Sequence, residues 1–118
     1  MYGLPRDFTG DFLVGRTLEA VLFNENQIQL LFDRKVAVSI MGEFQHQLGV
    51  DHSPCLTQDV PVKESQLMRL AGCSVVNALG TANGSLRLVF DTGEVVTVFD
   101  CPGYESYTIF NGDDTIYV

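Results

Sequence analysis

Apolar and polar side chains alternate with a period of two along most of the chain, which is the pattern of half-buried β-strands. In the first half the alternation runs through residues 17–23, 27–33 and 36–40. Turn-forming residues separate these segments at 24–26 and 33–35. Three short strands joined by short turns predict an antiparallel meander.

The second half of the chain repeats this pattern. Strands are predicted at 75–79, 86–90 and 95–99, and Gly93 in Asp91-Thr92-Gly93 suits the positive φ of a tight hairpin turn. Two further strands are predicted at 104–110 and 115–118, joined by Asn-Gly-Asp-Asp. The sequence therefore predicts a second meander followed by a hairpin.

Identical residues recur between the two halves. Gly15, Leu22 and Asn26 match Gly72, Leu79 and Asn83, which lie 57 positions later. One residue inserted near Gly84 then makes the spacing 58. At this spacing the matching residues are Leu30, Phe32, Asp33 and Val38 with Leu88, Phe90, Asp91 and Val96. Alternating Leu and Val inflate any comparison between strands, so both duplication and convergent patterning stay open. If the halves at about 15–41 and 72–99 are duplicated, neither meander covers its own apolar face and the two must pack together.

Between the halves, residues 60–71 have the features of a short helix. Asp59 suits an N-cap, Pro61 suits the first turn, and Gly72 suits a C-terminal stop. Residues 42–58 fit either an extension of the third strand or a helical turn, with a loop around Pro54. We therefore expect a single domain over 1–118 of the α+β class, mostly antiparallel β, with two meanders packed or partly closed into a barrel and one helix between them.

Charge and composition limit the function classes. The 118 residues carry 7 Lys plus Arg against 15 Asp plus Glu, a net charge of −8, which disfavours binding to nucleic acid. No apolar run approaches the ~18 residues of a membrane-spanning helix, and the first residues lack the apolar segment of a signal peptide. We expect a cytoplasmic protein without membrane contact, whose three cysteines are reduced and form no disulfide.

The densest polar cluster of the sequence contains both histidines. His46, His52 and Cys55 have ligand types that suit zinc, and Cys55 with either histidine could form a nucleophilic pair. Their spacing matches no compact metal motif, and no oxyanion hole or third catalytic group is recognisable. A loop with surface histidines is the favoured interpretation, so we expect no catalytic residue, no metal and no cofactor.

The end of the chain combines acids and tyrosines without any Lys or Arg after Arg87. Surface tyrosines beside carboxylates suit a basic protein partner, because the rings supply packing and the acids raise the encounter rate. The alternative is that the tyrosines pack inward and the acids only keep the protein soluble. The residues expected at the partner surface are Asp100, Tyr104, Glu105, Tyr107, Asp113 and Asp114.

The second half carries a pattern of a glycine-led strand at Gly72, a strand ending in Phe90-Asp91-Thr92-Gly93, and a closing Tyr104-Glu105-Ser106-Tyr107 strand. This pattern resembles small uncharacterised bacterial β-rich domains, some of which are immunity proteins of polymorphic toxin systems. The first half departs from it at Arg34-Lys35, where glycine would be expected.

The resemblance implies a fold more than an activity. With the acidic surface, the leading expectation is a non-enzymatic acidic binding protein, in the manner of a toxin-neutralising immunity protein. The alternatives are a small-ligand-binding or homodimeric accessory protein from mobile or environmental DNA, and an enzyme that uses the histidine loop.

Overall fold

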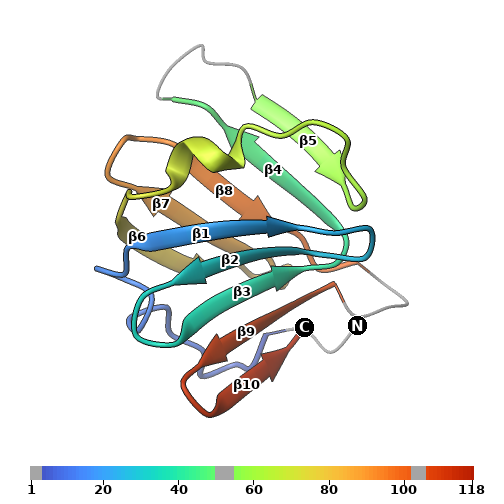
Figure 1. The fold of residues 1–118 in the computed structure, drawn as a ribbon. Coiled ribbons are helices and arrows are strands. Elements are labelled where there is room, and N and C mark those ends of the chain that lie inside the picture. The colour runs from blue at the N-terminus through green and yellow to red at the C-terminus, as the bar shows by residue number, and fades with distance from the viewer. Residues whose placement is uncertain (1–3, 50–54, 102–105) are drawn as a thin grey trace.

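Ten strands form two antiparallel sheets in a computed structural model, which describes residues 4–49, 55–101 and 106–118. Sheet 1 lies in front of sheet 2 in Figure 1. Sheet 1 has the order β1 (Leu18–Phe23), β2 (Ile28–Phe32), β3 (Val36–Ile40), β9 (Tyr107–Asn111) and β10 (Asp114–Tyr117). Sheet 2 has the order β5 (Cys55–Asp59), β4 (Glu43–Gln47), β8 (Val95–Val98), β7 (Leu86–Phe90) and β6 (Val75–Gly80).

Each sheet is built from both halves of the chain. Residues 41 and 42 alone connect β3 in sheet 1 to β4 in sheet 2, and the chain returns from β8 to sheet 1 at β9. The meander β1-β2-β3 is therefore completed by β9 and β10, and the meander β6-β7-β8 by β4 and β5. The described strands form two open sheets rather than the partly closed barrel, so that part of the expectation is not confirmed.

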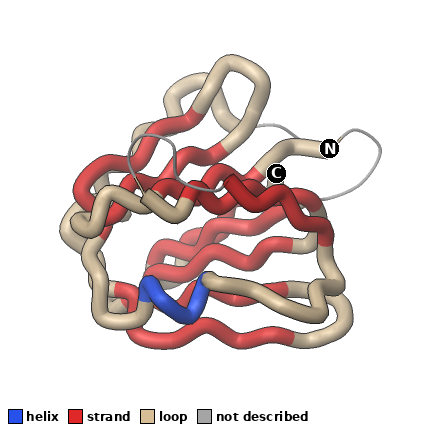
Figure 2. Tube along the Cα trace, turned by 90° about the horizontal axis from the view of Figure 1, so that it is seen from above, coloured by secondary structure: helices blue, strands red, loops and turns tan. Residues whose placement is uncertain are grey.

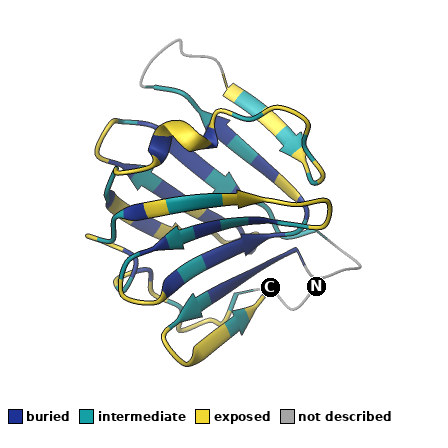
Figure 3. Ribbon diagram, viewed as in Figure 1, coloured by how far each residue is buried: buried dark blue, intermediate teal, exposed yellow. Residues whose placement is uncertain are grey.

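The alternating apolar side chains of both sheets meet in one core. Figure 3 shows buried residues on the middle strands and exposed residues mainly on the outer strands and turns. Each large apolar side chain that becomes buried stabilises the fold by about 1.5–3 kcal/mol relative to exposure. The largest fully buried side chains include Phe44, Phe90, Leu13, Leu18, Ile28, Leu30, Ile40, Leu67, Leu70, Leu86 and Leu88.

The two halves meet through matching backbone hydrogen bonds at the starts of β1 and β6. The Gly15 N–H donates to the Val75 carbonyl oxygen at 2.7 Å. The Gly72 N–H donates to the Leu18 carbonyl oxygen, also at 2.7 Å. Both glycines have positive φ, +86° and +87°, which other residues rarely adopt. The sequence match of Gly15 with Gly72 therefore corresponds to the same backbone conformation in the two halves.

The predicted helix over 60–71 is wrong. The structure has a single 3-10 turn there, η1 (Leu67–Leu70; blue in Figure 2), and no α-helix in the ranges described above. A helix of about ten residues is marginal in water. In the structure Val60 and Val62 pack against the core from the non-helical segment before η1. Over its described residues the fold is therefore all-β rather than α+β.

Residues 43–47 and 55–59, whose structure the sequence left open, form the strands β4 and β5. The helical-turn interpretation is wrong for 43–47, and this segment joins the second sheet instead of lengthening β3. No helix among the described residues is long and apolar enough to cross a lipid bilayer.

Candidate functional site

Tyr107 does not belong to the surface on which the sequence placed it. It points from β9 into the core, where it is fully buried, and its hydroxyl donates to the Gly84 carbonyl oxygen at 2.6 Å. Burial, followed by the charge of Asp100, raises the pKa of this phenol. Tyr107 is thus corrected to a core residue, and Tyr104 and Glu105 lie outside the described residues.

The acidic residues of the predicted partner surface lie apart. Asp113 and Asp114 are exposed at the β9–β10 hairpin, whereas Asp100 is half-buried near the first residue of β9. Five residues of β9 separate these places, a length of about 16 Å. The hairpin also adjoins the Arg34-Lys35 turn, since the Gly112 N–H donates to the Lys35 carbonyl oxygen at 3.0 Å. The fold therefore places Arg34 and Lys35 beside the C-terminal hairpin, although the sequence after Arg87 contains no basic residue.

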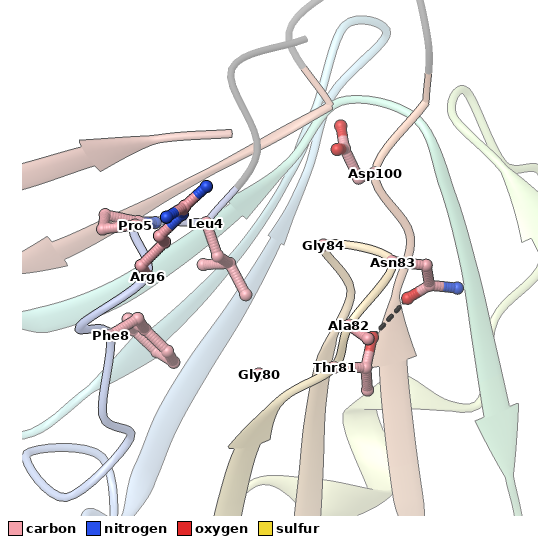
Figure 4. A pocket seen from close by; sticks show the side chains of 10 residues that line it. All are labelled: Leu4, Pro5, Arg6, Phe8, Gly80, Thr81, Ala82, Asn83, Gly84 and Asp100. Atoms are coloured by element: carbon pink, nitrogen blue, oxygen red, sulfur yellow. Dashed lines mark hydrogen bonds between the residues drawn. The ribbon is translucent and has the colours of Figure 1, made fainter.

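Asp100 borders a groove of about 510 Å³ between the N-terminal segment and the β6–β7 turn. In Figure 4, Leu4 and Phe8 extend toward Gly80, with Arg6 on their side of the groove and Asp100 on the opposite side. Position 80 has little room for a side chain, because a Cβ there would lie 2.8 Å from Leu4 Cδ1. The groove thus combines an apolar wall with one cationic and one anionic side chain.

Strand pairing gives the paired positions of sheet 1 equivalents in sheet 2. Ile40 of β3 pairs with Tyr107 of β9, as Val98 of β8 pairs with Phe44 of β4. Tyr107 and Phe44 are therefore structurally equivalent, and the same counting extends along all five strands of each sheet. Because the two halves share one framework, a position whose side-chain chemistry differs between them is a candidate for function.

The outward-facing side chains at the paired positions of sheet 1, here called the outer face of sheet 1, carry no charge, and the exposed Glu19 lies beside them at the β1 bulge. Exposed apolar side chains lie on its two outermost strands, with Leu22 on β1 48% exposed and Tyr117 on β10 56% exposed. Leu31 and Phe110 lie between them and are half-buried. The ten positions are Ala20, Leu22, Gln29, Leu31, Ala37, Ser39, Thr108, Phe110, Thr115 and Tyr117, of which Ser39 and Thr108 are buried.

The equivalent face of sheet 2 is more polar on β4, β5 and β7, although Leu79 on β6 is 49% exposed at the position equivalent to Leu22. Its β4 and β5 strands present Gln47 and Thr57 at the positions that Phe110 and Tyr117 occupy in sheet 1. Arg87 stands on β7 where sheet 1 has Gln29 on β2. The outer face of sheet 1 therefore differs from that of sheet 2 chiefly by two aromatic side chains, Phe110 and Tyr117, and this difference does not come from the framework that the two sheets share.

A second difference lies inside sheet 2. His46 on β4 is 1% exposed, and its Nε2 lies 3.0 Å from Oε1 of Glu94, which is 5% exposed. Arg69 of η1 adds its Nε at 3.7 Å from the same oxygen, and the Thr92 hydroxyl donates to Oε2 at 3.1 Å. We call His46, Glu94 and Arg69 the ionic cluster. It joins three elements: β4, the turn before β8, and η1.

The environment of His46 disfavours its cation. Burial lowers the pKa of the imidazole, the hydrogen bond and charge of Glu94 oppose this, and the charge of Arg69 lowers the pKa further. The net direction is down, so the ring is neutral at pH 7. Nε2 then carries the proton that is donated to Glu94, and Nδ1 is buried without a hydrogen-bond partner. His46 is therefore not the surface loop histidine that the sequence suggested.

In sheet 1 and the segment before it, the positions of the ionic cluster are apolar. Ile109 is equivalent to His46 by strand pairing, and Val36 is equivalent to Glu94. Phe12, 57 positions before Arg69, packs against the core. Sequence reasoning missed this cluster, although the alternation of Phe44 and His46 on one strand and the match of Glu94 with Val36 pointed to inward side chains.

The predicted histidine and cysteine pair does not form from its described members. His46 pairs with Leu56 across β4 and β5, and Cys55 is the next residue along, exposed on the opposite face of the sheet. His52 lies outside the described residues. Within those residues no group of three His, Cys, Asp or Glu side chains could hold a metal ion, and Cys55, Cys73 and Cys101 are free thiols.

Comparison with curated proteins and with solved structures finds no significant match. A family model does match, over residues 10–118, and it describes a family of unknown function, DUF6188. The match covers both meanders, the strand pairs β4-β5 and β9-β10, and the ionic cluster. The chain therefore belongs to DUF6188, a family of unknown function.

Proposed function

We propose that the chain is a non-enzymatic acidic binding protein that neutralises a basic partner protein, in the manner of an immunity protein that blocks a toxin. The observation that supports this proposal is the outer face of sheet 1, where Phe110 and Tyr117 stand at positions that are polar in sheet 2 and extend the apolar area of Leu22 and Leu31. Protein interfaces concentrate aromatic and apolar anchors at an uncharged centre and place charge at the rim.

Charge around the outer face favours a basic partner. Glu19 and Glu25 are exposed at the β1 side, and Asp113 and Asp114 are exposed at the β10 side. Arg34 and Lys35 at one end offset part of this charge, but the chain as a whole carries −8. A field of this sign speeds encounter with a cationic protein and opposes approach of a second copy. We therefore assign the face to a basic partner rather than to a homodimer.

The experiment takes the product of the neighbouring gene as the candidate partner and measures both its toxicity to cells and its affinity for this chain. The test variant combines Phe110→Gln with Tyr117→Thr, which are the residues that sheet 2 carries at the equivalent positions. Loss of two aromatic anchors should weaken binding at least tenfold, or about 1.4 kcal/mol, and should abolish protection.

The matched control is Arg87→Gln on the outer face of sheet 2, because Gln is the residue at the equivalent position in sheet 1. It should leave affinity unchanged. Equal loss in the control and the test variant, no loss in the test variant, or a neighbouring product that does not bind would contradict the proposal. So would a stable dimer of the free chain that Tyr117→Thr dissociates.

A second candidate function, binding of a small zwitterionic molecule, is favoured by the groove that Arg6 and Asp100 border. A guanidinium on one wall and a carboxylate on the other suit a ligand with an anionic and a cationic end. Thermal unfolding with a panel of free amino acids tests it. A concentration-dependent rise of the melting temperature that Arg6→Ala removes supports this function, and no rise with any of them contradicts it.

A further inference from the structure

We propose that the ionic cluster of His46, Glu94 and Arg69 is a pH-sensitive latch, which holds η1 against sheet 2 at neutral pH and releases it in acid. This inference is independent of the proposed partner. It rests on the geometry of the cluster, on the buried imidazole nitrogen without a partner, and on the apolar residues at the equivalent positions of sheet 1 and the segment before it.

The Glu94 carboxylate is the centre of the latch. Its Oε1 accepts the hydrogen bond from His46 Nε2 at 3.0 Å and faces Arg69 Nε at 3.7 Å. Its Oε2 accepts the hydrogen bond from the Thr92 hydroxyl. Arg69 lies between the fully buried Leu67 and Leu70. A change in the charge of the cluster therefore acts directly on the segment that covers this part of the core.

The fold does not require charges at these positions. Sheet 1 and the segment before it place Phe12, Val36 and Ile109 there, and sheet 1 has the same five-stranded arrangement. Well-packed apolar residues that replace a buried ion pair are often neutral or stabilising. Sheet 2 carries charged side chains at positions where apolar ones are compatible with the fold. This indicates a role that apolar side chains cannot fill, and titration is such a role.

Protonation of His46 is unfavourable in the closed state. The added proton goes to Nδ1, which is buried and faces no acceptor. The charged groups around the ring are Glu94 from the turn before β8 and Arg69 from η1, and Cys73 and Asp91 lie farther out beside Glu94. Only Glu94 favours the imidazolium, and its Oε1 already accepts the Nε2 proton. When η1 lifts away, water can solvate both ring nitrogens, so protonation favours the open state.

The consequence of opening is local. Cys73 N–H donates to the Leu70 carbonyl oxygen, and Gly72 N–H donates to that of Leu18 on β1. Release of η1 breaks these bonds and exposes the apolar side chains of Leu67 and Leu70. The strands of sheet 2 keep their own pairing, so we expect the change to be confined to residues near η1 and the turn before β8.

Hydrogen exchange of the full chain at about pH 7.5 and about pH 5.5 tests the latch. After correction for intrinsic exchange, the amides of 69–73 should open more in acid, by up to about tenfold for each unit by which folding lowers the pKa of His46. Amides in the middle of β2 and β7 should change little. The control His52→Gln replaces the other histidine of the chain and should keep the response.

Two variants should remove the response. His46→Gln can still donate its side-chain N–H to Glu94 but cannot take up a proton. The triple variant His46→Ile, Glu94→Val and Arg69→Phe copies the equivalent apolar residues Ile109, Val36 and Phe12. Acid-induced opening that persists in His46→Gln would overturn the proposal, whether or not the triple variant folds. Equal protection of the unmodified chain at both pH values, or a response lost in His52→Gln, would also overturn it.

Discussion

The rings of Phe32 and Phe90 stack between the two sheets, with their centroids 6.4 Å apart and their planes 15° from parallel. The two residues are the last of β2 and β7, they are 58 positions apart in the sequence, and both are buried. Each pairs with the first residue of an outer strand, Leu18 or Val75. The place where the two halves match in sequence is thus also the place where they touch.

Removal of either ring should destabilise the whole fold. Phe32→Ala and Phe90→Ala should each lower the free energy of unfolding by about 3–5 kcal/mol, because a large buried side chain leaves a cavity. The double variant should lose less than the total of the two, since the rings are in contact and their cavities merge. Denaturant unfolding measures all three, and strictly additive losses would contradict a shared contact.

Tyr107→Phe should cost about 1–3 kcal/mol, because the Gly84 carbonyl oxygen loses its buried donor. Folding raises the pKa of Tyr107, so its contribution to stability is complete below the unfolded pKa of about 10 and is lost as the pH rises above it. Unfolding measured between about pH 8 and pH 11 should show this decline in the unmodified chain and less of it in Tyr107→Phe.

The control for that variant is Tyr117→Phe, because the Tyr117 side chain is exposed at the edge of sheet 1. It should change stability by less than about 0.5 kcal/mol and leave the alkaline decline intact. If Tyr117→Phe removes the alkaline decline in stability, the decline does not come from Tyr107.

Removal of single members of the ionic cluster should have unequal effects. Glu94→Ala leaves the His46 Nε2–H buried without an acceptor and should cost about 1–3 kcal/mol. Arg69→Ala removes a side chain that is 49% exposed and a longer contact, so about 0–1 kcal/mol is expected. Urea unfolding at neutral pH compares them. An Arg69→Ala loss as large as that of Glu94→Ala would mean that Arg69, not His46, is the main partner of the carboxylate.

Gly72→Ala should destabilise by about 1–2 kcal/mol, since alanine is strained at a φ of +87°. No atom lies within 4 Å of the added Cβ, so the cost comes from the backbone alone. Gly15→Ala should cost a similar amount, because its φ and its open surroundings are the same. Melting temperatures of the two variants check this, and a clear difference between them would show that the two turns are not equivalent.

The local alternation of the chain was enough to predict the strands of both meanders and the turns between them. Strands at 18–23, 28–32 and 86–90 were predicted to within a residue or two, because side chains that point alternately to core and solvent leave a direct trace in the sequence. The pairs Gly15 with Gly72 and Phe32 with Phe90 were visible as identical residues 57 and 58 positions apart.

Alternation specifies which side chains share a face, but it does not specify which sheet a strand joins. Whether β4 continues the sheet of β3 or crosses to β8 depends on hydrogen bonds between residues about 50 positions apart, which leave no local pattern. The same non-local packing turns Tyr107 and His46 inward and leaves the chain before η1 non-helical, because core contacts outweigh weak helix propensity. The candidate sites follow from this packing, since the outer face of sheet 1 and the ionic cluster exist only once strands from both halves lie side by side.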